Sequence, residues 1–264
     1  MAAESDGTAR SAASDKLWNE MSIDPVELHL GKDSGFTLRA YRMSDTLPGA
    51  KPAEEPEEPE ALEDESADEP EAELSEDEDA PEPDPADFED EADDAEEDAL
   101  DATPEEVPVF LTRKGKLLVF REPELLVAFV RDNDDHDLAA VEEYGELQDR
   151  LSADDIVCDE DDTYELDLVV ANLRGGQESW EPELLIKAAE VGRDLGYALK
   201  NDSIIGSLAP GSPLDDLDET FRVIVDGGLR GKLAKRRLKK NDAQQAAIAW
   251  RGVIAKINDH VEWR

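Results

Sequence analysis

The chain has 264 residues, and 70 acidic residues against 27 lysines and arginines give it a formal net charge of −43. Its one cysteine, Cys158, excludes an intrachain disulfide, and no apolar run reaches the roughly 20 residues that a membrane-spanning helix needs. Residues 1–16 lack the apolar stretch of a secretion signal. These features exclude a secreted disulfide scaffold and a membrane protein, and they predict a cytoplasmic location.

The negative charge is concentrated in one stretch of the chain. Residues 52–106 hold 30 Asp or Glu, no Lys or Arg, and a single aromatic residue, Phe88. Such a segment cannot bury enough apolar surface to offset about 1–2 kcal/mol of backbone entropy per residue. We therefore predict a disordered acidic linker, rich in Pro, Glu and Asp, over residues 43–106, and a disordered tail over residues 1–16.

Two β-hairpins are predicted, one on each side of this linker. Val26, Leu28 and Leu30 alternate with polar residues, and the alternation resumes after a GKDSG turn, which predicts a hairpin within residues 17–42. Because an isolated hairpin is marginally stable in water, we expect it to dock on the domain beyond the linker. The second hairpin comprises VPVFL and LLVF at 107–120, with Lys114-Gly115 at its turn.

A globular domain over residues 107–228 contains several amphipathic helices. Apolar residues at helical spacing predict a short helix after Pro123, a second at 137–151 and a longer one at 182–200. Residues 164–170 fit either a strand or the start of a helix.

A further helix is predicted from its end signals. Ser212, Pro213 and Asp215 are typical of a capped helix start, with Asp215 in the place of the usual capping-box glutamate. Gly227-Gly228 is expected to end this helix.

Residues 229–264 are predicted to form a C-terminal helical segment, first basic and then amphipathic. Apolar residues recur every three or four positions from Ala243 to Val261, and we expect this seam around Trp250 to be buried against the domain or a second copy of the chain. Seven positive charges precede the seam and are the candidate polyanion-binding residues: Arg230, Lys232, Lys235, Arg236, Arg237, Lys239 and Lys240. The fold class predicted from all these elements is α+β, with two hairpins and several amphipathic helices in one domain.

Patterns that suggest a phosphate or metal site do not meet the requirements of those sites. GSLAPGSP at 206–213 has the glycine spacing of a phosphate-binding loop, but it lacks the lysine, and Pro213 removes a backbone donor. His136 lies among aspartates without the additional His or Cys ligands of a transition-metal site. The acidic run at 159–162 does not match the spacing of a calcium-binding loop.

A catalytic cysteine is not expected either. Carboxylates next to Cys158 raise the pKa of a thiol, whereas a nucleophile needs an electropositive setting and a base. We therefore predict no catalytic residue, no cofactor, no metal and no enzymatic activity.

One loop offers candidate partner-binding residues. In LRGGQESWEP at 173–182, Arg174 and Trp180 flank two flexible glycines, and Arg and Trp are typical of the energetically dominant residues of interfaces. Trp180 can equally pack over the start of the helix at 182–200, and this is the interpretation that we favour.

Several motifs resemble a known family. LWNEMSIDPVE at 17–27, GFTLRAY at 35–41, ANLRGG at 171–176, WEPELLIKAAEVGRDLGYALK at 180–200 and LAPGSPLDDLDE at 208–219 are similar to an actinobacterial family often labelled "primosomal protein" or "DNA primase". The resemblance covers both ends of the chain and skips the acidic middle. It implies an accessory binding protein, because one cysteine and three histidines cannot supply a zinc ribbon. No site residue is carried over from this family.

Two functions follow as hypotheses. The leading one is a non-catalytic intracellular interaction protein whose folded domain binds a protein partner. The alternative is a nucleic-acid-associated, primosome-like accessory factor that uses the basic cluster at 230–240, with the acidic linker limiting non-specific contacts. The sequence does not predict the oligomeric state.

Overall fold

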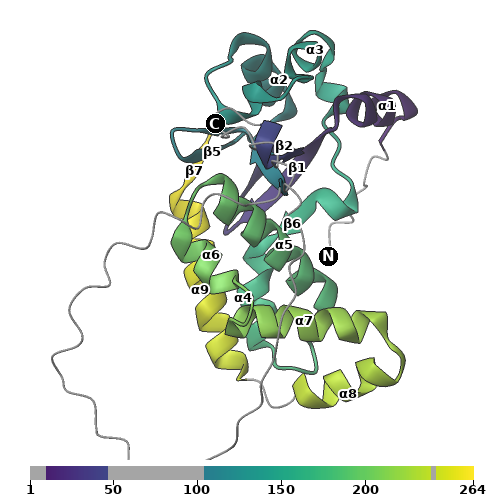
Figure 1. Cartoon of the computed structure of the whole chain (residues 1–264), viewed down its shortest axis with the longest axis vertical. Coiled ribbons are helices and arrows are strands. Elements are labelled where there is room, and N and C mark those ends of the chain that lie inside the picture. Colours follow the sequence, from purple (N-terminus) through teal and green to yellow (C-terminus); the bar gives the residue numbers. More distant parts are fainter. Residues whose placement is uncertain (1–9, 47–103, 239–241) are drawn as a thin grey trace, which may run out of the picture.

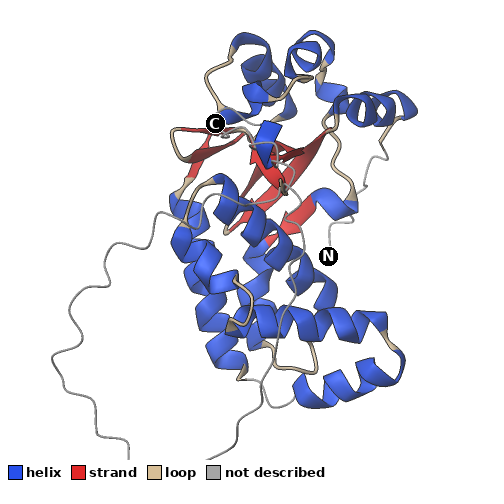
Figure 2. Ribbon diagram, viewed as in Figure 1, coloured by secondary structure: helices blue, strands red, loops and turns tan. Residues whose placement is uncertain are grey.

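The computed structural model describes residues 10–46, 104–238 and 242–264. Figures 1 and 2 show a middle layer of strands with one group of helices on each side. The α+β fold class predicted from the sequence is confirmed. Within the described residues, no helix is both long enough and apolar enough to cross a membrane.

The main sheet joins segments from both sides of the undescribed stretch 47–103. Its strand order is β3-β2-β1-β6, with β6 parallel to β1 and the other pairs antiparallel. These strands are β1 (Ile23–Leu30), β2 (Asp33–Met43), β3 (Glu106–Phe110) and β6 (Thr163–Glu165). The predicted first hairpin is β1–β2, and its turn is tighter than GKDSG suggested, because Leu30 already pairs with Asp33.

A second sheet has the order β4-β5-β7, and its strands are β4 (Thr112–Arg113), β5 (Lys116–Val119) and β7 (Val261–Trp263). Lys114 and Gly115, at φ 53° and 72°, make the predicted turn between β4 and β5. The prediction that VPVFL pairs with LLVF was mostly wrong, because β2 offers β3 a longer complementary edge, from Arg39–Phe110 to Met43–Glu106.

The two sheets meet at Gly35. Phe36 bridges Phe120 by backbone hydrogen bonds, and a Cβ on Gly35 would lie 2.5 Å from the Phe120 carbonyl oxygen. Only glycine allows this approach, so the glycine that the sequence indicated as part of a turn is instead a contact point inside β2.

In the described part of the chain, three helices cover one face of the strand layer: α1 (Ala12–Met21), α2 (Pro123–Asp132) and α3 (Tyr144–Arg150). Residues 12–16 were expected in the disordered tail, yet Ser11 caps α1 and Arg10 donates to the Val157 carbonyl oxygen. The reason is burial of Trp18, which is 1% exposed and whose Nε1 donates to the Asp155 carbonyl oxygen. Residues 1–9 lie outside the described part of the chain.

Within residues 10–46 and 104–238, four short 3-10 helices connect the larger elements: η1 (Ser44–Thr46), η2 (Asp137–Ala140), η3 (Ala153–Asp155) and η4 (Glu160–Asp162). The single helix predicted at 137–151 is therefore interrupted. Its break is at Val141, which is extended, after His136 has capped η2 by accepting from the Ala139 N–H.

The two ends of the predicted acidic linker belong to the fold. The Ser44 N–H donates to the Glu105 carbonyl oxygen at 2.8 Å, and Glu106 begins β3. The predicted disorder of the remaining linker concerns residues 47–103, which lie outside the described residues.

Six helices of the described chain lie on the other face: α4 (Leu166–Arg174), α5 (Pro182–Ala198), α6 (Asp202–Leu208), α7 (Pro213–Asp226), α8 (Gly228–Leu238) and α9 (Ala243–Asp259). The ambiguous stretch 164–170 contains the end of β6 and the start of α4. The apolar seam of α9 is buried in the core beside α4, and the strand β7 that follows pairs with β5. The C-terminal segment is thus built into the domain.

A buried arginine ties the strand layer to α5. Arg39, on β2, donates to the Tyr164 hydroxyl and to Asp162 Oδ1, both at 2.7 Å, and lies 3.5 Å from Asp194 Oδ2. Tyr41 donates to the same Asp194 oxygen at 2.6 Å. Burial raises the pKa of Tyr41 and the Asp194 hydrogen bond raises it further, so the hydroxyl keeps the proton that it donates.

We predict that Arg39→Met lowers the free energy of unfolding by about 3–5 kcal/mol, because it leaves the partly buried carboxylates of Asp162 and Asp194 without their cation. Replacing Asp162 and Asp194 with Asn in the same variant should recover much of this loss. Arg150→Met, which removes a more exposed arginine from its pairs with Glu20 and Glu146, is the control and should change stability little. Urea unfolding measures all three, and equal losses for Arg39 and Arg150 would contradict the prediction.

We also predict that Trp250→Ala costs about 3–5 kcal/mol, because the indole is 2% exposed in the core. Ile248→Ala on the same helix removes a side chain that is 58% exposed and should change stability by no more than about 0.5 kcal/mol. Thermal or urea unfolding of the two variants measures their stabilities. A loss in the Trp250 variant alone shows that burial of the indole, and not a general effect on α9, is responsible.

Candidate interaction surface

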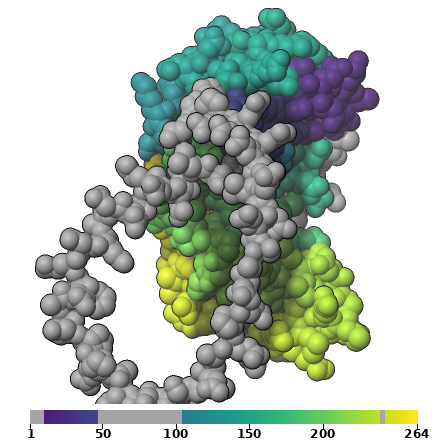
Figure 3. Space-filling view, in the orientation of Figure 1, coloured from purple at the N-terminus to yellow at the C-terminus, as the bar shows by residue number. Residues whose placement is uncertain are grey.

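An open groove lies between α7 and α8, with a volume of about 400 Å³. It is lined by Glu219, Thr220 and Val223 from α7 and by Arg230, Leu233, Ala234 and Arg237 from α8. The α8 residues are spaced three, four and seven apart, so they lie on one side of that helix. Figure 3 shows the two helices protruding at one end of the molecule.

Three glycines shape the hairpin that forms the groove. Gly227 and Gly228 have φ of 76° and 66°, which turns the chain directly from α7 into α8. A Cβ on Gly231 would lie 3.0 Å from the Val223 carbonyl oxygen, so this glycine lets the helices approach closely. With Gly231, the buried Ala234 and Leu238 form the side of α8 that faces the protein.

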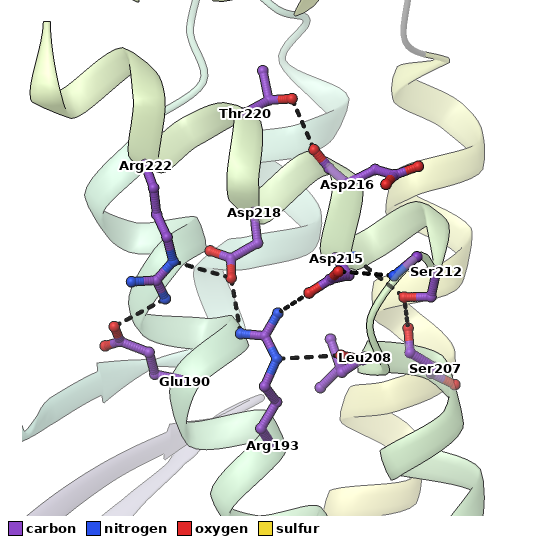
Figure 4. Close-up of polar contacts among 11 residues, drawn as sticks. Glu190, Arg193, Ser207, Leu208, Ser212, Asp215, Asp216, Asp218, Thr220 and Arg222 are labelled. Carbon is purple, nitrogen blue, oxygen red and sulfur yellow. Dashed lines mark hydrogen bonds and ion pairs between the residues drawn. The ribbon is translucent and has the colours of Figure 1, made fainter. Parts of the chain in front are cut away.

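An arginine of α5 fixes α7 in position. Arg193 donates to Asp218 at 2.8 Å, to Asp215 at 2.7 Å and to the Leu208 carbonyl oxygen at 3.2 Å (Figure 4). Arg222 continues the network, because it pairs with Asp218 and with Glu190. Through these contacts α5 and the end of α6 hold α7, and α7 carries α8.

The start of α7 is capped as predicted, with one difference. Ser212 Oγ accepts from the Asp215 N–H, and Pro213 is in the first turn. The Asp215 carboxylate, expected to return to the Ser212 N–H, accepts from the Gly211 N–H and from Arg193 instead. The GSLAPGSP segment is therefore the end of α6, a turn and the cap of α7.

The surface of the hairpin combines exposed apolar side chains with cations. Leu229 is 80% exposed and Leu233 is 55% exposed, and the four-residue spacing makes them neighbours on α8. Val223 is partly exposed across the groove. The sequence analysis did not single out these apolar residues. Two leucines four positions apart among cations could have indicated them.

The structure locates five of the seven candidate polyanion-binding residues. Arg230 and Arg237 line the groove, while Lys232, Lys235 and Arg236 are exposed elsewhere on α8. Among the described residues, none of these five forms an ion pair. Lys239 and Lys240 lie outside the described residues.

The two candidate partner-binding residues of the 173–182 loop are not brought together as one exposed pair. Arg174 is exposed at the end of α4, whereas Trp180 is 7% exposed. Trp180 Nε1 donates to the Leu173 carbonyl oxygen, and the indole lies edge-on to Phe221. Trp180 therefore packs in the core, as the favoured interpretation predicted.

The surroundings of Cys158 and of His136 favour the uncharged form of each side chain. Burial raises the pKa of the Cys158 thiol, and the nearby Glu27 and Asp162 carboxylates raise it further. Burial lowers the pKa of His136, whose Nε2 is 2.7 Å from the Tyr144 hydroxyl. Within the described ranges, no group of three or more His, Cys, Asp or Glu side chains is arranged to hold a metal ion.

Comparisons with known proteins point to one family. Residues 98–258 match the sequence model described as the SatS C-terminal domain. A crystal structure of the SatS C-terminal domain in complex with bromine is similar, with a TM-score of 0.59 and 18% identity, over 94% of this chain and 97% of that chain. That identity shows a shared fold alone. No curated protein sequence matches the chain.

These findings overturn the resemblance to the family labelled primosomal protein or DNA primase. The motifs that suggested it are elements of the fold: GFTLRAY lies within β2, and LAPGSPLDDLDE is the turn and capped start of α7. These motifs therefore contribute to the fold.

The hairpin itself yields a prediction. Gly231→Val should separate α8 from α7, because its side chain would collide with the Val223 and Ile224 carbonyl oxygens. We expect faster amide hydrogen exchange in α8 with little change in α9. Gly252→Ala is the control, since a Cβ there has no neighbour within 4 Å. Unchanged exchange in α8 of the Gly231 variant would show that the close packing is not needed.

Proposed function

The chain belongs to the SatS C-terminal domain family, and we propose that it is a non-catalytic interaction protein whose α7–α8 groove binds a protein partner. The partner segment has apolar side chains flanked by acidic residues. We propose a cytoplasmic location for this interaction, as the composition suggests.

The exposure of Leu229 and Leu233 carries the proposal. Large apolar side chains that gather beside a groove mark interaction sites on soluble domains. Here Leu233 lines the groove together with Val223 and Ala234, so a partner's apolar side chain that enters the groove meets apolar atoms from both helices. An amphipathic helix that lays its apolar face in a groove is a common form of peptide recognition.

The charges define the rest of the partner. Arg230 and Arg237 are seven residues apart on one helix, which corresponds to about 10 Å along its axis. Acidic residues at a similar separation, on both sides of an apolar anchor, would pair with both arginines. These contacts would favour acidic partners and would weaken with added salt.

Nucleic acid is the second candidate partner, because α8 exposes five cations without ion pairs among the described residues. Phosphate contacts, however, need no exposed leucines. The apolar content of the groove therefore favours a protein segment.

The proposal is tested with a labelled helical peptide that carries two leucines four residues apart and glutamates seven residues apart around them. We expect it to bind the full chain, and Leu233→Asp should weaken binding by about tenfold or more, since that side chain lines the groove between Arg230 and Arg237 in sequence. Fluorescence anisotropy at moderate salt measures the affinity.

Two controls accompany this experiment. Leu168→Asp alters an exposed leucine on α4 and should leave peptide affinity unchanged. A peptide with lysines in place of the glutamates should not bind. If a single-stranded oligonucleotide binds while the acidic peptide does not, and Leu233→Asp leaves oligonucleotide binding unaltered, the nucleic-acid candidate replaces the proposal.

A further inference from the structure

We infer that an acidic segment of this same chain, centred on Phe88, occupies the α7–α8 groove and competes with the partner. The contact between this segment and the groove is argued from charge, from Phe88 and from chain length. The competition with a partner rests, in addition, on the proposed function. The segment lies in residues 52–103, outside the described residues, and its sequence is what identifies it.

Charge complementarity selects this occupant. Residues 52–103 contain 28 Asp or Glu and no Lys or Arg. Residues 228–240 contain seven Lys or Arg and no acid, and five of these cations are on α8, exposed. The rest of the chain offers no comparable concentration of positive charge, so the acidic segment is drawn to α8 above other surfaces.

Phe88 supplies an apolar contact with the groove that the carboxylates alone cannot make. It is the one aromatic residue of the segment, and Asp87, Glu89 and Asp90 flank it. In the groove, Leu233 can pack against the Phe88 ring, and Arg230 and Arg237 can pair with the carboxylates on either side of it. The chain therefore carries a match to its own groove.

The tether permits the contact. Described residues stop at Thr46 and resume at Pro104, and the bond from the Ser44 N–H to the Glu105 carbonyl oxygen brings the two ends together. Since an extended residue spans about 3.3–3.6 Å, the 16 residues from Phe88 to Pro104 let the Phe88 side chain reach roughly 50–58 Å from these ends. A domain of this size has a radius of gyration of only about 16 Å, so length is no obstacle.

The expected effect is moderate. A tethered segment acts at an effective concentration up to roughly millimolar. If its intrinsic dissociation constant is about 10⁻⁴ M, it weakens partner binding by about tenfold. The effect should shrink as salt screens the charges.

The contact is tested with a spin label on a cysteine introduced by Ala92→Cys, in full-length protein that also carries Cys158→Ser. At low ionic strength we expect broadening of the α8 amide resonances, with α2 unaffected, and recovery at about 0.5 M salt. Phe88→Ser in the labelled chain should reduce the broadening. Absence of broadening in α8 at low salt, or equal broadening over all helices, would overturn the inference.

The competition is tested with the acidic peptide described above. Phe88→Ser combined with Gln and Asn in place of Glu and Asp over 82–98 keeps the chain length and should bind the peptide about tenfold more tightly than the unaltered chain. Equal affinities would overturn competition. If neither chain binds the peptide while the spin label broadens α8, the intramolecular contact stands and the proposed partner fails, so the two failures are distinguishable.

Discussion

The fold depends on one buried cation in the strand layer. Arg39 has a side chain only 9% exposed, and its partners come from η4, β6 and α5, more than 120 residues along the chain. A buried charge is tolerated only where such partners are in place. The arrangement therefore fixes the N-terminal hairpin, β6 and α5 in position relative to one another. A long acidic stretch separates the hairpin from β6 and α5 in sequence.

This constraint extends to the surface that we propose as functional. Asp194, which meets Arg39 and Tyr41, is adjacent to Arg193, which holds Asp215 and Asp218 of α7. One turn of α5 thus connects the sheet on one side with α7 on the other. The position of α8 follows, because this helix packs mainly on α7. A helix with few neighbours is among the less stable parts of a domain, and binding elements are often of this kind.

Charge is distributed in a way that gives α8 a distinct role. The chain is strongly acidic, yet α8 is basic and exposes leucines between its cations. On the function that we propose, such a helix attracts acidic segments from other proteins and from the same chain. The external and internal ligands would then differ mainly in concentration and in tethering, and the acidic stretch would modulate binding in the groove.

The sequence by itself determined the α+β class, the first hairpin, the capped start of α7, the buried seam of α9 and the basic character of α8. Each depends on local signals: alternation of period two, helical spacing, a cap residue or a run of charge. Tertiary structure alone decided that β3 pairs with β2, that residues 12–16 are helical, and that Trp180 is buried while Leu229 and Leu233 are exposed. It also decided that Arg39 meets Asp162 and Asp194. The physical reason is that pairing, burial and charge compensation depend on residues far apart in the chain, and local patterns contain no record of which distant residue becomes a neighbour.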